Sequence, residues 1–161
     1  VVDTQNFMTK TGVRTFEAAA FLRRNGADVT RVRKLFRENA AEYKAKADAV
    51  SQAEIYRNAY AISICHSEGL ASPTVVGAQA ANELLDIRGV KASFVLTEYQ
   101  NKLFFSARSI DEVNVQVIME RMGGGGHLNI AGCQLENTSV EEGIIVLKRT
   151  LDKMIEEGEI S

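Results

Sequence analysis

The chain has 161 residues, of which 45% are hydrophobic and 25% charged, and its formal net charge is −2. These values are typical of a globular protein with a sizeable core, and they exclude the overall basic field that recruits long nucleic acid. No apolar run approaches the roughly 18 residues of a membrane span. Its two cysteines, Cys65 and Cys133, have neither CxxC spacing nor nearby metal-ligand partners, which favours a reducing, cytoplasmic setting.

The first part of the chain predicts helices after a short strand. It opens with "VVDTQNF" and no initiator methionine, and the two β-branched residues before Asp3 are typical of the end of a buried strand. We therefore expect a piece cut from a longer protein. Apolar spacing predicts two helices before residue 40, the first ending near Gly26. A segment rich in alanine, lysine and glutamate then predicts an exposed linker helix over residues 39–57.

The next part alternates between strands and helices. Residues 59–66 have the composition of a strand. Ser72 as a capping hydroxyl and Pro73 at the first helical position predict the start of a helix. Two further strands follow, and they form a hairpin whose turn contains Asn101.

The last part of the chain contains an unusual run of glycines. A short helix capped by Asn114 leads into four consecutive glycines, residues 123–126, which we expect to form a loop. Residues 131–136 predict a last strand, and Ser139 with Glu142 forms a capping box for a final helix. This order of elements predicts an α/β fold in which helices flank a small mixed β-sheet.

The glycine run suggests a phosphate-binding site. Backbone amides of glycines can approach an anion closely, and His127 follows them as a donor suited to a phosphate oxygen. Ser106 and Arg108 alternate onto one face of a strand, and the fork of an arginine matches phosphate. A flexible turn is the alternative explanation of the run. The absence of GxxxxGK[ST] excludes a P-loop nucleotide triphosphatase. The candidate glycines are Gly123, Gly124, Gly125 and Gly126.

These motifs carry a family resemblance. "GGGGH" followed by "AG", with "FSARS" and "NVQVIME" upstream, resembles the DHH-associated domain of DHH-family phosphoesterases. "DTQNFMTKTGVRTFEAAAFLRRNGAD" resembles the closing segment of the DHH domain, and the whole chain is most similar to cyclic-di-AMP phosphodiesterases of the GdpP type. The resemblance implies a remnant of the DHH domain over residues 1–38, the linker helix over 39–57, and a substrate-binding DHH-associated domain over 58–161.

The resemblance also implies the chemistry of the parent protein. In that family two manganese ions, held by aspartates and histidines, activate the water that attacks phosphorus. Asp3 matches one of the metal-ligand positions and is expected to be catalytic, and His127 is expected to act in catalysis and in substrate binding. Ser106, Arg108 and the four glycines are expected to bind substrate. The parent would hydrolyse cyclic di-AMP to linear pApA.

The other metal-binding motifs of the family are absent from this chain. We therefore expect the chain alone to be inactive and not to hold the two manganese ions by itself. Its expected partner is the phosphate of a cyclic dinucleotide or a short oligonucleotide, with no long nucleic acid. The resemblance implies a cytoplasmic domain whose parent is anchored to a membrane by a segment absent from this chain. The sequence leaves homodimer formation open.

Two other functions are compatible with the same motifs. One is an oligoribonuclease or a RecJ-like exonuclease of the same superfamily. The other is a nucleic-acid-binding module without catalysis, like the related domain of alanyl-tRNA synthetases. The segment "DTQNF…RTFEAA" favours the GdpP type over the exonucleases, and the acidic net charge argues against the module.

Four further residues have competing explanations. We expect His66 to be a structural or surface histidine, and Cys133 to pack in the core. Asn129 follows His127 closely, and the sequence does not decide between a ligand contact and hydrogen bonding within the loop. Arg14 is equally compatible with a phosphate contact and with a solvated or ion-paired side chain.

Overall fold

The computed structural model of the chain describes residues 29–30, 39–110 and 113–161. The chain divides into two compact units, Val1–Ala40 and Ala41–Ser161. Asp3, Arg14 and the first predicted helix lie outside the described residues. The assignment of residues 1–38 to a DHH domain therefore stays a prediction.

The second unit is built on a six-stranded mixed sheet with the strand order β1-β2-β3-β4-β6-β5. Strands β2 and β3 are parallel, and every other neighbouring pair is antiparallel. This confirms the predicted α/β class. The strands are β1 (Glu54–Tyr56), β2 (Tyr60–Cys65), β3 (Ala92–Tyr99), β4 (Lys102–Ser109), β5 (Gly125–Gly126) and β6 (Ile130–Glu136), and the helices are α3 (Ala40–Ser51), α4 (Pro73–Leu84), α5 (Val115–Arg121) and α6 (Val140–Glu156).

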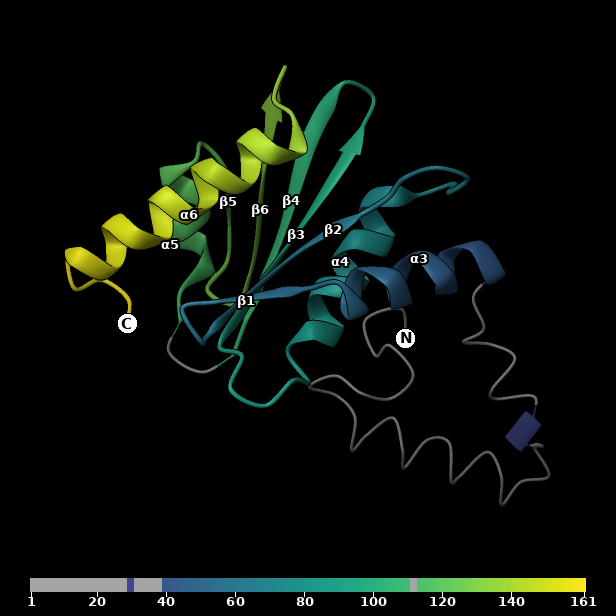
Figure 1. Cartoon of the computed structure of the whole chain (residues 1–161), viewed down its shortest axis with the longest axis horizontal. Coiled ribbons are helices and arrows are strands. Elements are labelled where there is room, and N and C mark those ends of the chain that lie inside the picture. Colours follow the sequence, from purple (N-terminus) through teal and green to yellow (C-terminus); the bar gives the residue numbers. More distant parts are fainter. Residues whose placement is uncertain (1–28, 31–38, 111–112) are drawn as a thin grey trace. The chain divides into compact units, whose positions relative to one another are not determined.

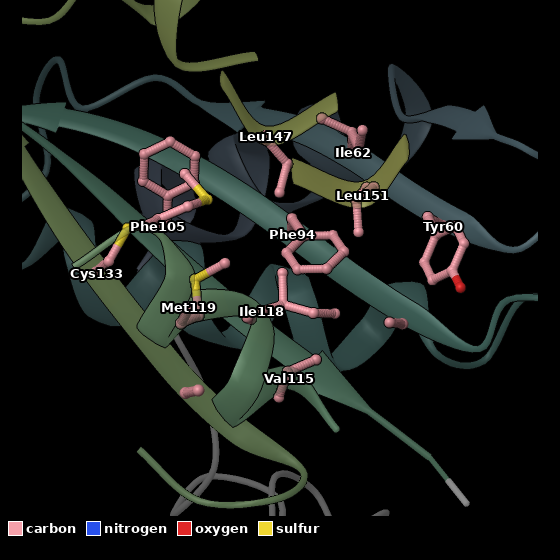
Figure 2. Close-up of a cluster of buried hydrophobic side chains, with 14 of the residues drawn as sticks. Tyr60, Ile62, Phe94, Phe105, Val115, Ile118, Met119, Cys133, Leu147 and Leu151 are labelled. Atoms are coloured by element: carbon pink, nitrogen blue, oxygen red, sulfur yellow. The ribbon is translucent and has the colours of Figure 1, made fainter. Parts of the chain in front are cut away.

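Helices cover the two faces of the sheet (Figure 1). Helices α5 and α6 lie on one face, where Phe94, Phe105, Ile118 and Leu147 belong to a single buried cluster (Figure 2). Helices α3 and α4 lie on the other face, and their buried cluster takes its sheet residues from β2 and β3 only. Because successive side chains of a strand point to opposite faces, each strand contributes to both sides.

Local sequence chemistry explains several element boundaries. Gln100 and Asn101 have positive φ angles of 53° and 62°, which is the type I′ geometry that joins twisted antiparallel strands. The side chain of Asn114 accepts a hydrogen bond from the N–H of Val117 at 3.3 Å and caps α5. Ser139 forms the predicted capping box at the start of α6. The hairpin and both caps confirm their predictions.

The predicted linker helix is too long. Helix α3 ends at Ser51 and does not reach residue 57, because Glu54–Tyr56 pair with β2 as strand β1. The ring of Tyr56 packs against the core, and its hydroxyl donates to Asp152 of α6 at 2.7 Å. These tertiary contacts outweigh the local helix propensity of the segment.

Two smaller predictions are also corrected. Pro73 begins α4 as predicted, but the hydroxyl of Ser72 makes no capping hydrogen bond. Its backbone carbonyl instead accepts from the N–H groups of Val75 and Val76, at 3.1 and 3.2 Å. In addition, the glycine run is not wholly a loop, since Gly125–Gly126 pair with β6 as strand β5.

Candidate functional site

Helices α3 and α4 pack on one face of the sheet and form a buried cluster with it. Another part of this face lies outside that cluster. Along β4, residues alternate between buried side chains and half-buried ones. The half-buried side chains, Phe104, Ser106 and Arg108 among them, lie on the α4 side of the sheet. Neither buried cluster of the described residues includes a side chain of β4, β5 or β6 from this side. We call this area, made by these three strands, the open half of the face.

Strand register brings the predicted Ser106 and Gly125 into one row with Gly132, which was not predicted. Ser106 of β4 lies opposite Gly132 of β6, and Gly132 lies opposite Gly125 of β5. Residues opposite each other on neighbouring strands share a face. A Cβ atom on Gly132 would approach the carbonyl oxygen of Phe105 to 2.7 Å. The two glycines therefore leave the surface beside Ser106 without side chains.

The next row contains the predicted arginine and histidine. Arg108 lies opposite Ile130, and Ile130 exchanges both backbone hydrogen bonds with His127, at 2.7 and 3.3 Å. Neighbouring strands are about 4.8 Å apart, so the backbones of Arg108 and His127 are separated by roughly 10 Å. The long arginine side chain and the imidazole thus start from opposite sides of Ile130. The structure brings Ser106, Arg108, Gly125 and His127 into two adjacent rows.

Arg108 is a half-buried cation without an acidic partner among the described residues. Its Nη1 donates to the carbonyl of its neighbour Ala107 at 2.8 Å, and its buried Nε has no hydrogen-bond partner. Burial lowers the pKa of the guanidinium below its ordinary value, because removal from water disfavours the charged form. A partly desolvated arginine with an unused donor is suited to an anionic ligand.

Gly123 and Gly124 end α5. Gly123 has φ +89° and donates its N–H to the carbonyl of Glu120, while Gly124 donates to Met119 at 2.8 Å. This is a Schellman motif, which terminates a helix with a left-handed residue. A Cβ atom on Gly124 would lie 2.2 Å from the carbonyl oxygen of Gly132. Both glycines thus have structural roles, and their N–H groups are used within the chain.

Gly125 and Gly126 differ in what surrounds them. A Cβ atom on Gly126 would lie 2.5 Å from Ala131 Cα, so this glycine permits close approach of β5 to β6. Gly125 has no left-handed φ, and a Cβ atom there would meet nothing within 4 Å. Its bare backbone therefore faces open space, and the structural needs that explain the other three glycines do not apply to it.

The turn after the glycines holds the predicted histidine. The side chain of His127 is exposed. Asn129 donates from Nδ2 to the hydroxyl of Ser109 at 2.9 Å, which favours loop hydrogen bonding over a direct ligand contact. Ser109 and Gly132 were not predicted from the sequence. Strand alternation places Ser109 on the buried face, where a hydroxyl must find partners, and this signal could have identified it.

His66 and Cys133 have the roles expected of them. His66 is exposed and follows β2, whose last residue, Cys65, pairs with Thr97. It lies at the opposite end of the sheet from Arg108, which pairs with Ser93. Cys133 is buried in the core, where burial raises the pKa of its thiol to about 11.

Metal-ligand clusters and membrane-spanning helices are both absent from the described residues. These residues contain no group of three or more histidine, cysteine, aspartate or glutamate side chains that could hold a metal ion. No helix within residues 39–110 and 113–161 is long and apolar enough to cross a bilayer.

The fold and the glycine-histidine motif together define the class of the protein. Residues 59–157 match the model of the DHHA1 domain, and the chain belongs to this family. The resemblance seen in the sequence is confirmed.

Particular relatives sharpen this assignment. The chain is 46% identical to the cyclic-di-AMP phosphodiesterase PdeA of Listeria monocytogenes over 143 residues. This match covers 88% of this chain and 22% of that protein. It is 41% identical to the cyclic-di-AMP phosphodiesterase GdpP of Bacillus subtilis, over 98% of this chain and 24% of that protein. The chain thus spans less than a quarter of either relative.

One solved structure shares the fold. An exopolyphosphatase-related protein from Bacteroides fragilis superposes with a TM-score of 0.69 at 20% identity, over 88% of this chain and 43% of that protein. This likeness supports the α/β architecture described above.

Proposed function

We propose that this chain is the substrate-binding part of a phosphodiesterase that hydrolyses cyclic di-AMP to linear pApA. Membership of the DHHA1 family and the two relatives named as cyclic-di-AMP phosphodiesterases support this proposal. Because the chain spans less than a quarter of those relatives, the catalytic activity is assigned to the longer parent protein.

The single observation that carries the proposal is the state of Arg108. Its guanidinium is partly desolvated, its Nε is buried without a partner, and no carboxylate of the described residues neutralises it. A cation in this state is costly unless an anion completes it. A phosphate group has the charge and the oxygen spacing to accept two parallel hydrogen bonds from a guanidinium.

Residues next to Arg108 fit a nucleotide phosphate. Ser106 lies two positions along the same strand face and supplies a hydroxyl donor, and Gly125 presents backbone without a side chain. His127 follows two residues after Gly125 and supplies an imidazole donor. Phe104 is a half-buried aromatic residue on the same side of β4, and nucleobases stack on such side chains. Serine, arginine, histidine and glycine then bind the phosphates of the substrate.

Manganese belongs to this proposal as a cofactor of the parent. The described residues offer no group of metal ligands, so they do not fit a two-metal centre by themselves. We place the ions on other parts of the parent, with Asp3 as one ligand, where they would supply an activated water. This chain is then expected to yield no linear product when it is incubated with cyclic di-AMP and manganese. Metal-dependent turnover by the pure chain would contradict this assignment.

Binding calorimetry tests the proposed function. The chain is titrated with cyclic di-AMP, with linear pApA and with a single-stranded oligoribonucleotide. We expect cyclic di-AMP to bind, and Arg108→Ala to weaken that binding at least tenfold, since a hydrogen bond to a charged group contributes about 1.5–3 kcal/mol. Arg149→Ala is the matched control, because Arg149 is an exposed arginine of α6.

Two outcomes would contradict the proposal. Unchanged affinity of the Arg108→Ala variant would remove this residue from the site. A preference for the oligoribonucleotide over cyclic di-AMP would favour an oligoribonuclease or a nucleic-acid-binding module instead.

The parent's membrane anchor and its assembly are further parts of the proposal. The resemblance to phosphodiesterases of the GdpP type supports an anchor in a segment outside this chain, and fractionation of cells that express the parent tests it. Homodimer formation by this chain is tested by sedimentation, where the mass of a monomer would exclude it.

A further inference from the structure

Two hairpins of the sheet have two-residue loops that differ in backbone geometry. The loop between β3 and β4, Gln100–Asn101, has positive φ at both residues. The loop between β5 and β6 is Leu128–Asn129, closed by the two backbone hydrogen bonds between His127 and Ile130. Neither of its residues has a positive φ.

The difference in φ angles determines which interactions keep each loop in its conformation. A two-residue loop with positive φ at both positions matches the right-handed twist of the strands, whereas loops without it splay the strands apart. The Gln100–Asn101 loop therefore maintains its hairpin by its own backbone preference. The Leu128–Asn129 loop needs contacts from elsewhere in the fold to keep its geometry.

Those contacts come from the end of β4 and the start of α5. The N–H of Ser109 donates to the carbonyl of Asn129 at 3.1 Å, and the N–H of Val115 donates to the carbonyl of Leu128 at 2.9 Å. The side chain of Asn129 donates to the hydroxyl of Ser109 at 2.9 Å. Ser109 thus contacts the loop through its backbone and through its side chain, and it follows Arg108 directly.

The direction of the side-chain hydrogen bond follows from the number of available protons. A serine hydroxyl has one proton, and Ser109 lies 2.6 Å from the carbonyl of Val113, which can only accept. The proton therefore goes to Val113, and the hydroxyl oxygen accepts from the amide of Asn129. Ser109 is only 5% exposed, so water does not replace these partners easily.

We propose that Ser109 and Asn129 are positioning residues. They hold the Leu128–Asn129 loop, and with it His127, at a fixed place relative to Arg108 on the neighbouring strand β4. This inference rests on the proposed phosphate site, to which it adds two residues that do not touch the ligand. Arg108 and His127 would otherwise be free to vary in separation, because the loop has no turn preference of its own.

Amide hydrogen exchange of this chain tests the positioning without any ligand. Asn129→Ala is expected to accelerate exchange of the Ile130 and His127 amides about tenfold or more, because their mutual hydrogen bonds then open more often. Exchange of the Lys102 amide, next to the Gln100–Asn101 loop, should not change. Equal exchange at His127 in the variant and the unchanged protein would overturn the proposal.

Calorimetry with cyclic di-AMP tests the consequence for binding. Asn129→Ala and Ser109→Ala are each expected to weaken affinity at least threefold. The double variant should lose no more than the stronger single variant, because the side chain of Asn129 acts only through the hydroxyl of Ser109. Asn101→Ala is the matched control. It removes an asparagine from the same position of the other loop, and is expected to lower thermal stability while affinity stays unchanged.

The Arg108→Ala variant distinguishes the positioning role of Ser109 and Asn129 from the phosphate site itself. If Arg108→Ala weakens binding and Asn129→Ala does not, the positioning role is refuted and the phosphate site stands. If neither change alters binding, the proposed function itself fails.

Discussion

Serines in the two halves of one sheet face differ in their hydrogen-bond partners. In the half covered by helices, the hydroxyls of Ser63 and Ser93 donate to carbonyls of Ala49 and Ala81. Both carbonyls lie in the last turn of a helix, α3 or α4, where no helical N–H is available to them. These two hydroxyls of the covered half are therefore satisfied inside the fold, whereas the buried hydroxyl of Thr97 on the same face has no hydrogen-bond partner within the described residues.

In the open half, the polar groups lack such partners. The hydroxyl of Ser106 makes no hydrogen bond within the described part of the chain, and Arg108 donates only to the carbonyl of its neighbour Ala107. The serines thus differ because the hydroxyls of Ser63 and Ser93 reach carbonyls at helix ends and the hydroxyl of Ser106 does not. Ser106 and Arg108 of the open half are available to a ligand, whereas Ser63 and Ser93 of the covered half stabilise the fold.

The largest expected effect is on the stability of the Gly124→Ala variant, which should differ sharply from that of Gly125→Ala. Gly124→Ala places a methyl group within 2.2 Å of a backbone oxygen, so the backbone of β5 or β6 must shift. We expect a loss of about 3 kcal/mol in the free energy of unfolding, which corresponds to roughly 10 °C in the melting temperature. Calorimetric melting measures it. A variant that melts like the unchanged protein would show that β5 does not lie against β6 as described.

Gly125→Ala is expected to leave the stability of the fold intact and to weaken ligand binding. The methyl group meets nothing within 4 Å and requires no unusual backbone conformation, so stability should stay the same or rise by about 0.4–1 kcal/mol. Affinity for cyclic di-AMP should fall about tenfold, a loss of about 1.4 kcal/mol, because the methyl occupies the space proposed for a phosphate oxygen. Titration beside thermal melting measures both quantities. Normal binding by this variant would favour a simple turn.

Alanine variants of Ser93 and Ser106 test the same difference between the covered half and the open half. Ser93→Ala leaves the carbonyl of Ala81 without its partner, and is expected to cost about 1–2 kcal/mol in stability with no change in affinity. Ser106→Ala should leave stability within about 0.5 kcal/mol and weaken binding several-fold. Denaturant melting and titration of both variants decide the matter. The comparison fails if the two serines show the same pattern.

The smallest expected effect concerns the buried face. Burial raises the pKa of Cys133 to about 11, so its thiol stays protonated at neutral pH and gains reactivity only as the pH approaches that value. Alkylation by iodoacetamide, followed by mass spectrometry, should be slow at pH 8 in the unchanged protein. Gly124→Ala should accelerate it, since the added methyl would lie 2.3 Å from Cys133 Cβ. Rapid labelling of the unchanged protein would show that this face is not closed.

Much of the fold was predictable where local chemistry determines it. The turn at Asn101, the cap at Asn114 and the capping box at Ser139 each depend on a few neighbouring residues. Strand β1 was not predictable in this way, because its Tyr56 is held by Asp152, 96 positions away in the sequence. Strand β5 consists of two glycines, which have no strand propensity, and it forms because the end of α5 delivers them to β6.

The candidate site was predictable only in part. Alternation along β4 placed Ser106 and Arg108 on one face, and this is confirmed by their burial and register. The four glycines could not be told apart in the sequence, because the roles of Gly124 and Gly126 depend on distances to β6 and that of Gly123 on its positive φ. Alternation along β4 places Ser109 on the buried face, but its partners could not be named from the sequence, since they belong to a loop about 20 residues away.

Chemical-shift mapping by NMR tests the central claim most directly. Titration of the isotope-labelled chain with cyclic di-AMP should shift the amide signals of Ser106, Arg108 and Gly125 most, while those of Ser63 and Ser93 stay in place. That result would locate the ligand on the open half of the face. Saturable shifts confined to other elements, or no shifts at ligand concentrations in the millimolar range, would contradict the account.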